Sequence, residues 1–210
     1  MLMQESKNIS AYRQSLKERI LATAMDAFTH RGIKAVRMDD IAQALQISKR
    51  TLYEIYANKE DLLFEGITTY HRQKATAFVA YAEGCSNVME IILGFYRQKV
   101  EESRQINPLF YTDLQKYSKI VEYMREEHNR NHEQFMDFLQ RGVDEGYFLP
   151  SLNYGIVSRV FDALGHYIMD SHLYTQYTVE ELLSNLIFIS LRGFCTEKGM
   201  QSLDKVLYKQ

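Results

Sequence analysis

The side chains best suited to chemistry form one short run, Ser48-Lys49-Arg50-Thr51, followed after one residue by Tyr53. Ser48 can open a helix as its N-cap, because its hydroxyl can accept a backbone N–H one turn later. The basic and hydroxyl side chains behind that cap would lie at the exposed end of the helix. Such donors bind base edges and grip phosphates. The run therefore predicts a helix that enters DNA.

Apolar residues around this run predict another short helix in front of it, crossing it at a steep angle. Ala42 is small enough to let the two helix backbones approach closely. The segment thus has the spacing of a helix-turn-helix. Its apolar contacts would come from Ile41, Leu45, Ile47, Leu52 and Ile55.

This segment resembles the N-terminal domain of the TetR family of bacterial transcriptional regulators. The resemblance covers roughly Arg13 to Tyr70. In that family a helix like Arg13–Arg31 packs behind the reading pair, and Gly32 fits as its left-handed C-cap. The most specific matching stretches are Asp40-Ile41-Ala42, Ile47–Tyr53 and Asn58–Leu63.

Two positions depart from the family pattern. Gln46 stands in the turn where the family usually has glycine, which predicts either a positive φ or a slightly different turn. Arg37 stands where the family usually has Ser or Thr as the cap of the first reading helix. Loss of that cap would cost ~1 kcal/mol. Asp39 and Asp40 would offset part of the cost through the helix dipole.

The candidate DNA contacts extend beyond the reading helix. Asn58 can cap the next helix, so the ammonium and a backbone N–H of Lys59 could present themselves to a phosphate. Arg37 could also reach a phosphate or remain solvated, and both interpretations stay open. The full set is Arg37, Ser48, Lys49, Arg50, Thr51, Tyr53, Tyr56 and Lys59.

The charge distribution separates the two ends of the chain. The net charge is −2, but residues 1–37 hold seven Lys/Arg against three Asp/Glu. From His71 onward, 15 Lys/Arg face 18 acids. Positive charge thus lies where the first helix would approach a duplex, as nucleic-acid binding requires. The later part should not bind DNA.

Composition favours an all-α protein. Two prolines interrupt a 210-residue chain that is 46% hydrophobic, and its apolar residues recur at helical spacing. We expect a helix-turn-helix domain at residues 10–57, a connecting helix at 58–84 and a C-terminal effector-binding and dimerisation domain at 85–210. Beyond the connecting helix, helices are expected at Val88–Arg104, Pro108–Tyr117, Ser118–Glu145, Tyr154–Tyr174 and Val179–Cys195, with an amphipathic tail from Gln201.

Cysteine usage and the N-terminus bear on the cellular compartment. Two cysteines, far apart, form neither a disulfide framework nor a Cys-based zinc site. The sequence shows no signal peptide and no apolar stretch of the ~20 residues that would span a bilayer. We expect a cytoplasmic protein without membrane contact.

The last long helix should form a dimer interface. It is apolar nearly all round between Asn185 and Arg192, so it needs burial on two sides. The second side is most simply another copy of the chain. The family resemblance implies the same, because the last two long helices of each subunit usually pair with those of its twin in a four-helix bundle. Candidate interface residues are Leu164, Ile168, Leu186, Ile189 and Gly193.

Polar residues interrupt the apolar stripe of the helix expected at Ser118–Glu145. His128 and Asn131 could be satisfied by internal hydrogen bonds, or they could line an effector pocket, since pockets combine apolar walls with a few polar groups. Both interpretations stay open. The pocket would consist of Phe95, Tyr96, Tyr111, Met124, His128, Asn131 and Phe135.

Two sets of potential metal ligands recur at helical spacing. They are the pair His128 and His132, and the trio Asp162, His166 and Asp170. Surface or interface packing explains each set more simply, because no definite further ligand accompanies it. We therefore expect neither a metal nor a cofactor.

These observations predict a homodimeric transcriptional regulator, most simply a repressor, released from a palindromic operator by a small-molecule effector. An enzyme would need a nucleophile–base pair or a cofactor loop, and no such motif occurs. A second alternative is an architectural or cell-division factor with the same DNA-binding head and no effector. A cavity near His128 would favour the regulator, and a solid core there would favour the alternative.

Overall fold

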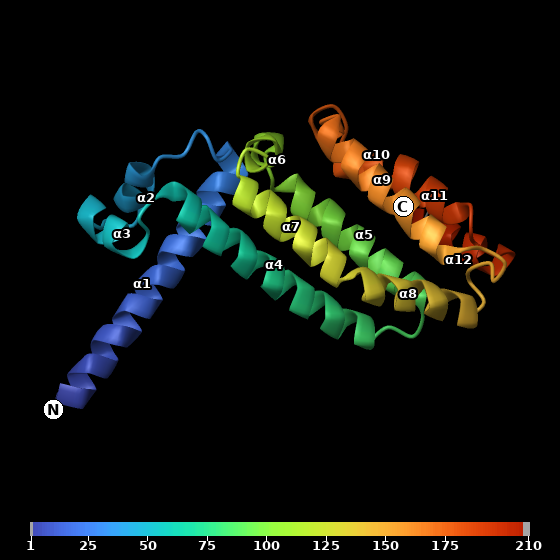
Figure 1. The fold of residues 1–210 in the computed structure, drawn as a ribbon, viewed down its shortest axis with the longest axis horizontal. Helices are drawn as coiled ribbons and strands as arrows, with labels where there is room; N and C mark the ends of the chain where they lie inside the picture. Colours follow the sequence, from blue (N-terminus) through green and yellow to red (C-terminus); the bar gives the residue numbers. More distant parts are fainter. Residues whose placement is uncertain (1, 208–210) are drawn as a thin grey trace. The chain divides into compact units, whose positions relative to one another are not determined.

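The structure, a computed structural model, describes residues 2–207, and within this range the chain forms helices and loops without strands (Figure 1). The predicted all-α class is therefore confirmed. The chain divides into two compact units. The first unit contains the chain up to Lys74 together with Ile106–Glu122, and the second contains Ala75–Gln105 and the chain from Tyr123 onward.

The first unit is built on the long helix α1 (Leu2–Arg31). Gly32 ends it with a φ of +82°, and its N–H donates to the Phe28 carbonyl at 2.9 Å, as the predicted left-handed C-cap requires. Helices α2 (Met38–Ala44) and α3 (Lys49–Ile55) follow. A core of fully buried residues holds these helices together: Ile20, Ala24, Phe28, Ile33, Leu52, Leu62 and Leu63.

The turn between α2 and α3 shows which conformation the glutamine at position 46 adopts. Gln46 adopts a φ of +55°, so a non-glycine residue takes the left-handed conformation that glycine adopts more easily. The N–H of Ile47 then donates to the Ala42 carbonyl at 3.0 Å. At the other end of α2, the Asp40 carboxylate accepts the Arg37 N–H at 2.8 Å, which is the bond that the third helical residue makes in a capping box.

Helix α4 (Lys59–Glu83) begins behind the predicted cap, since the Asn58 side chain accepts the Asp61 N–H at 2.9 Å. Helix α6 (Pro108–Leu114) also belongs to the first unit. Its N-cap, Asn107, donates its backbone N–H to the Thr29 carbonyl at 2.8 Å. The segment around α6 is therefore tied to the end of α1, although Asn107 and Thr29 are 78 residues apart in sequence.

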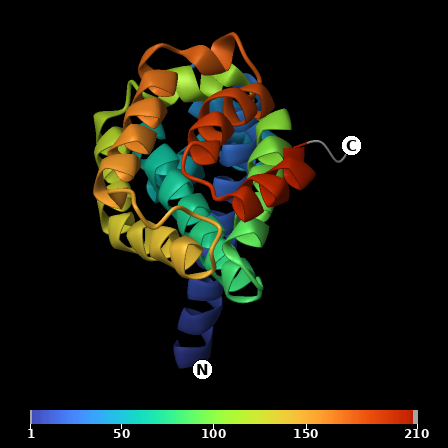
Figure 2. The same cartoon turned by 90° about the vertical axis from the view of Figure 1, so that its right-hand side faces the viewer.

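The second unit packs α5 (Val88–Arg104) against α8 (His132–Asp144) and the C-terminal helix α12 (Glu197–Leu207) (Figure 2). Its other long helix, α9 (Tyr154–Asp170), contacts α8. The core is aromatic: the Phe148 and Phe194 rings meet edge to face at 5.0 Å, and further rings surround them. These are Phe135, Phe138, Tyr154 and Phe161.

Four predicted helices differ from the structure in length or continuity, and one of them, expected at Pro108–Tyr117, ends at Leu114. The helix expected at Ser118–Glu145 has nearly that extent but is interrupted at one residue, Asn131, between α7 (Ser118–Arg130) and α8. The interruption is slight, because the Asn131 N–H still donates to the Glu127 carbonyl at 3.0 Å. The helix expected at Tyr154–Tyr174 ends at Asp170, because His172 takes a left-handed φ of 51° before a short 3₁₀ turn, Leu173–Thr175.

The helix expected at Val179–Cys195 is also interrupted. It consists of α10 (Val179–Leu182), a π-helical segment (Leu183–Ile187) and α11 (Phe188–Arg192). A π-helix inserts extra backbone into a helix and shifts the faces on either side. Side chains before and after the segment therefore do not follow one regular apolar stripe.

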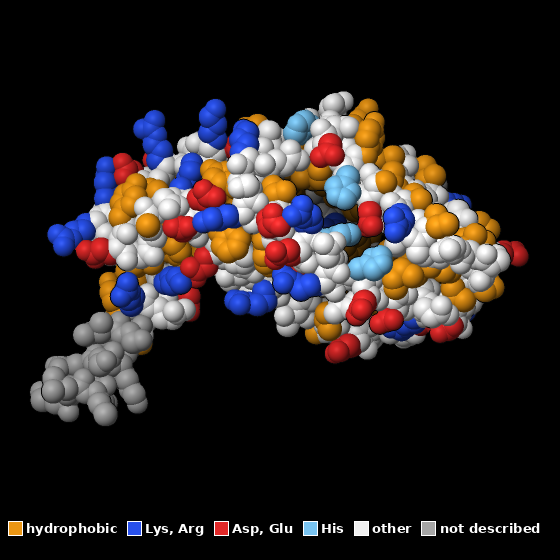
Figure 3. Space-filling model, viewed as in Figure 1, with side chains coloured by type: hydrophobic (Ala, Val, Ile, Leu, Met, Phe, Trp, Pro, Cys, Tyr) orange, Lys and Arg blue, Asp and Glu red, His pale blue; other side chains and the backbone are white. Residues whose placement is uncertain are grey.

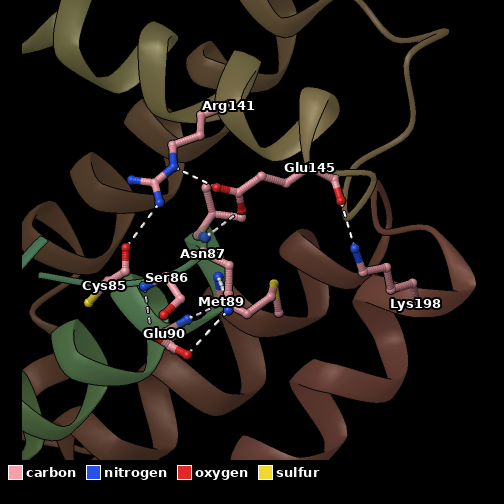
Figure 4. A network of polar contacts seen from close by, with 9 residues as sticks. Cys85, Ser86, Asn87, Met89, Glu90, Arg141, Glu145 and Lys198 are labelled. Atoms are coloured by element: carbon pink, nitrogen blue, oxygen red, sulfur yellow. Dashed lines mark hydrogen bonds and ion pairs between the residues drawn. The ribbon is translucent and has the colours of Figure 1, made fainter. Parts of the chain in front are cut away.

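A polar network fixes the loop before α5 within the second unit (Figure 4). The Glu145 carboxylate accepts the Val88 N–H at 2.8 Å and pairs with Arg141 at 2.6 Å. Arg141 in turn donates to the Cys85 carbonyl at 3.2 Å. Lys198, from α12, donates to the Glu145 carbonyl at 2.7 Å. The carboxylate thus places negative charge at the N-terminus of α5, where the helix dipole favours it.

Candidate nucleic-acid interface

Helix α3 is held by its cap and by one buried side chain. The Ser48 hydroxyl accepts the Thr51 N–H at 3.0 Å and lies 2.8 Å from the Thr51 hydroxyl, so the predicted N-cap is present. Leu52 is completely buried. This anchor turns the opposite face of α3 outward, and Lys49, Arg50 and Tyr53 are exposed there.

Two ion pairs hold the cations of α3. The Lys49 ammonium lies 2.5 Å from the Asp39 carboxylate on α2. The Arg50 Nε lies 2.9 Å from the Glu54 carboxylate, one turn along the same helix. Hydrogen bonding to these carboxylates, aided by their charge, raises the pKa of both cations above their ordinary values.

Lysine and arginine side chains project from the side of the first unit that carries α2, α3 and the loop before them (Figure 3). Arg37, in that loop, is exposed. The surface therefore combines an open reading helix with flanking cations, which is the arrangement that phosphate and base contacts need.

Tyr56 is the one predicted DNA contact whose side chain is buried. It is only 4% exposed, and the Lys17 ammonium lies 5.7 Å from its ring centre. Burial, with the charge of Glu65, raises the pKa of its phenol well above the ordinary value. Because its side chain packs in the core of the first unit, the prediction that Tyr56 contacts DNA is wrong for its side chain.

The Lys59 side chain is engaged within the protein. Its ammonium donates to the carbonyls of Ile33 at 2.9 Å and Val36 at 3.0 Å. Partial burial lowers its pKa, against the opposing charge of Asp113. The ammonium thus stabilises the loop before α2, and the predicted phosphate contact now rests on the backbone N–H at the start of α4.

The predicted pocket residues do not form one cluster. Tyr111 lies in the first unit, where its ring packs edge to face on Phe110 at 5.7 Å. Tyr96 packs on Phe188 at 5.1 Å. Phe135 belongs to the aromatic core of the second unit. Three further residues are more open: Phe95 and Met124 are exposed, as is Asn131, which separates α7 from α8.

His128 has a partner that the sequence did not indicate. Its Nε2 lies 3.0 Å from the Asp162 carboxylate on α9, so one residue from each suspected ligand set forms a pair. Within residues 2–207, no group of three such side chains could hold a metal ion. A separate open depression of about 420 Å³ lies where α4 ends and α5 begins, and it is lined by Ala80, Tyr81, Gly84, Cys85, Glu90 and Leu93.

The second unit carries large apolar side chains at its surface. Leu164, Ile168 and Leu186, predicted to form a dimer interface, are half-buried, whereas Gly193 is exposed. The residues with the most exposed apolar surface on α9 and α11 are Ile156 (62%), Val160 (47%), Tyr167 (56%) and Ile189 (61%). Only Ile189 among these four was predicted; the other three follow one face of α9 at helical spacing.

No helix in the described range is both long and apolar enough to span a bilayer. The first unit, by contrast, has the features of a DNA-binding domain: a capped and exposed basic helix at the second position of a helix-turn-helix.

Comparison with known proteins agrees with this class. Residues 20–65 match the family model described as bacterial regulatory proteins of the tetR family. The HTH-type transcriptional repressor KstR2 of Mycobacterium tuberculosis H37Rv is 25% identical over 150 residues, which span 69% of this chain and 75% of that protein. KstR2 of Mycolicibacterium smegmatis is 27% identical over a similar share, 69% and 73%.

Solved structures share the fold across both units. A TetR-family regulator from Agrobacterium tumefaciens has a TM-score of 0.68 at 16% identity, covering 88% of this chain and 100% of that one. A regulator from Saccharomonospora viridis, solved with choline, has a TM-score of 0.67 at 18% identity and the same coverage. These structures show the fold, and the family-model match together with the likeness to named repressors identifies a DNA-binding transcriptional regulator. Its helix-turn-helix region, residues 20–65, is similar to that of the tetR family of bacterial regulatory proteins.

Proposed function

We propose that the protein is a homodimeric repressor that binds an inverted-repeat operator and leaves it when a small molecule binds the second unit. The observation that carries the proposal is the exposed basic surface of α3, with the Arg50 side chain 89% exposed. Arginine at such a position can donate two hydrogen bonds to the O6 and N7 atoms of guanine.

The exposed apolar face of the second unit supports a dimer. Ile156, Val160 and Tyr167 on α9 and Ile189 on α11 each leave apolar surface open to water, which a second copy of the chain would cover. A two-fold axis through this face pairs two identical reading helices. Such a dimer binds half-sites spaced by about one turn of DNA, ~34–36 Å.

The second unit also offers features suited to an effector. His128 and Asp162 place a polar pair between α7 and α9, and histidine side chains gather around a hollow on the face drawn in Figure 3. Similar proteins named as repressors favour this function over an architectural factor without an effector. An effector would bind the two conformations unequally, with a coupling of ~1–3 kcal/mol.

The proposal includes no catalytic step and no cofactor. Repression follows from occupancy of the promoter. Release follows from a change in the spacing of the two helix-turn-helix units of the dimer. It places the protein in the cytoplasm, with the DNA that it binds.

Replacing Arg50 with alanine tests base reading. We expect Arg50→Ala to reduce discrimination between the operator and single-base variants at the contacted position by ~10–100-fold, which corresponds to ~1–3 kcal/mol for a lost bidentate contact. Competition binding with labelled duplexes measures this. Arg37→Ala, which removes an exposed cation outside α3, serves as the control and should weaken all duplexes alike. Equal discrimination by Arg50→Ala and the unmodified protein would remove Arg50 from the readout.

A further inference from the structure

The two cations of the reading helix are already paired before any DNA is bound. Asp39 lies 2.5 Å from the Lys49 ammonium, and Glu54 lies 2.9 Å from the Arg50 guanidinium. Lys49, Arg50 and Glu54 are largely exposed and Asp39 is half-exposed, so these pairs add little to stability. Their position on the DNA-reading surface therefore suggests a role in binding.

The Arg50–Glu54 pair leaves one edge of the guanidinium free. Glu54 accepts from Nε, so the two terminal nitrogens of Arg50 remain available as parallel donors. Guanine presents two acceptors, N7 and O6, that match such a fork in the major groove. Glu54 can therefore hold Arg50 in a fixed orientation while the free edge contacts a base.

A phosphate, unlike a guanine edge, is repelled by the carboxylate that pairs with Arg50. Phosphate oxygens carry negative charge, so a carboxylate 2.9 Å from the guanidinium opposes their approach. Asp39 has the same effect at Lys49. Non-specific binding depends almost entirely on phosphate contacts. The acids thus penalise non-specific complexes more than a complex in which Arg50 reads guanine.

We propose that Glu54, assisted by Asp39, is a specificity-determining positioning residue: it orients Arg50 toward base edges and disfavours its use as a phosphate contact. The inference rests on the proposed function, since it requires an operator that the protein prefers over other DNA. It concerns the ratio of operator affinity to non-specific DNA affinity, which base contacts alone do not determine.

The matched variants are Glu54→Gln and Glu18→Gln. Glutamine at position 54 retains an oxygen that can accept from Arg50 Nε but removes the charge. Glu18, on α1, accepts a hydrogen bond from Gln14 and does not pair with Lys49 or Arg50. Its substitution therefore removes the same charge without releasing either of these cations. Binding to the operator and to a scrambled duplex is measured for both variants across several salt concentrations.

For Glu54→Gln we expect affinity for the scrambled duplex to rise ~10-fold while operator affinity changes less than about threefold, so the specificity ratio falls. The salt slope on scrambled DNA should also steepen by ~1, because Arg50 then gains a phosphate contact. Glu18→Gln should raise both affinities by a similar factor and leave the ratio unchanged.

The two possible failures are distinguishable. If Glu54→Gln shifts both duplexes by the factor seen for Glu18→Gln, with an unchanged salt slope, Glu54 contributes only its charge and this proposal is overturned. If the unmodified protein already shows no preference between operator and scrambled DNA, the proposed function itself fails. Equal melting temperatures of the variants check that the fold is retained.

Discussion

Ile189→Arg should convert the regulator from a dimer into monomers and lower its affinity for a two-half-site operator by ~100-fold or more, the range expected when linked binding is lost. Ile189 is among the most exposed apolar residues on the second unit. In a two-fold interface the substitution acts twice, because each copy buries its own arginine. A buried charge without a partner costs several kcal/mol.

Light scattering and operator binding measure the two effects. Val79→Arg is the matched control, since Val79 is an exposed apolar residue on α4, outside the α9 and α11 face. The control should remain dimeric and retain its affinity. An Ile189→Arg protein that stays dimeric would locate the interface elsewhere on the chain.

Asp113→Ala should destabilise the first unit by ~2–3 kcal/mol, as expected when hydrogen bonds to a charged and buried acceptor are lost. The Asp113 carboxylate is buried on α6 and accepts the Lys34 N–H at 2.7 Å and the Lys116 ammonium at 2.9 Å. Without it, the Lys34 N–H loses its acceptor and the contact between α6 and the loop after α1 loosens. Denaturant unfolding at neutral pH measures the loss.

The same residue predicts a pH dependence. Burial works against ionisation of Asp113, but Lys116 and the Lys34 N–H outweigh it and hold the pKa below the ordinary value. A depressed carboxyl pKa stabilises the folded state above the unfolded-state pKa, near 4, and this contribution disappears as pH falls through the folded-state pKa.

The difference in stability between Asp113→Ala and the unmodified protein should therefore be full at pH 7 and shrink in acid. Asp26→Ala removes an exposed aspartate from the same unit and should change stability little at any pH. A difference that stays constant down to pH 2 would contradict the assignment of a charged Asp113.

Local sequence signals made much of the helix-turn-helix unit predictable. Ser48, Asn58 and Gly32 act through bonds to backbone groups within a few residues, so their roles follow from residue type and spacing. The Arg50–Glu54 pair also has the i,i+4 spacing of a helical ion pair and could have been predicted in the same way.

Contacts between distant segments were not predictable in this way. Lys59 donates to carbonyls 23 and 26 residues away, and the Lys34–Asp113 bond spans 79 residues. Which group a long side chain reaches depends on the packed fold. Sequence spacing alone therefore left the Lys59 ammonium free for phosphate, and it gave no indication that α6 belongs to the first unit.

The polar interruption at Asn131 illustrates a different limit. The sequence predicts His128 and Asn131 on one continuous helix, where a polar group on an apolar face needs a hydrogen-bond partner or a binding role. In the structure Asn131 lies at the one-residue interruption between α7 and α8, where it is exposed, and His128 pairs with Asp162. No proline or glycine marks this break, and the periodic pattern continues across it.

Selection of bound duplexes from a random DNA library tests the central claim most directly. The protein is incubated with the library at physiological salt, and bound sequences are amplified and read through several rounds. We expect enrichment of an inverted repeat whose half-sites lie about one helical turn apart and contain a guanine at the position read by Arg50. Recovery of sequences without a shared motif, or of the same motif at equal strength with Arg50→Ala, would contradict the account.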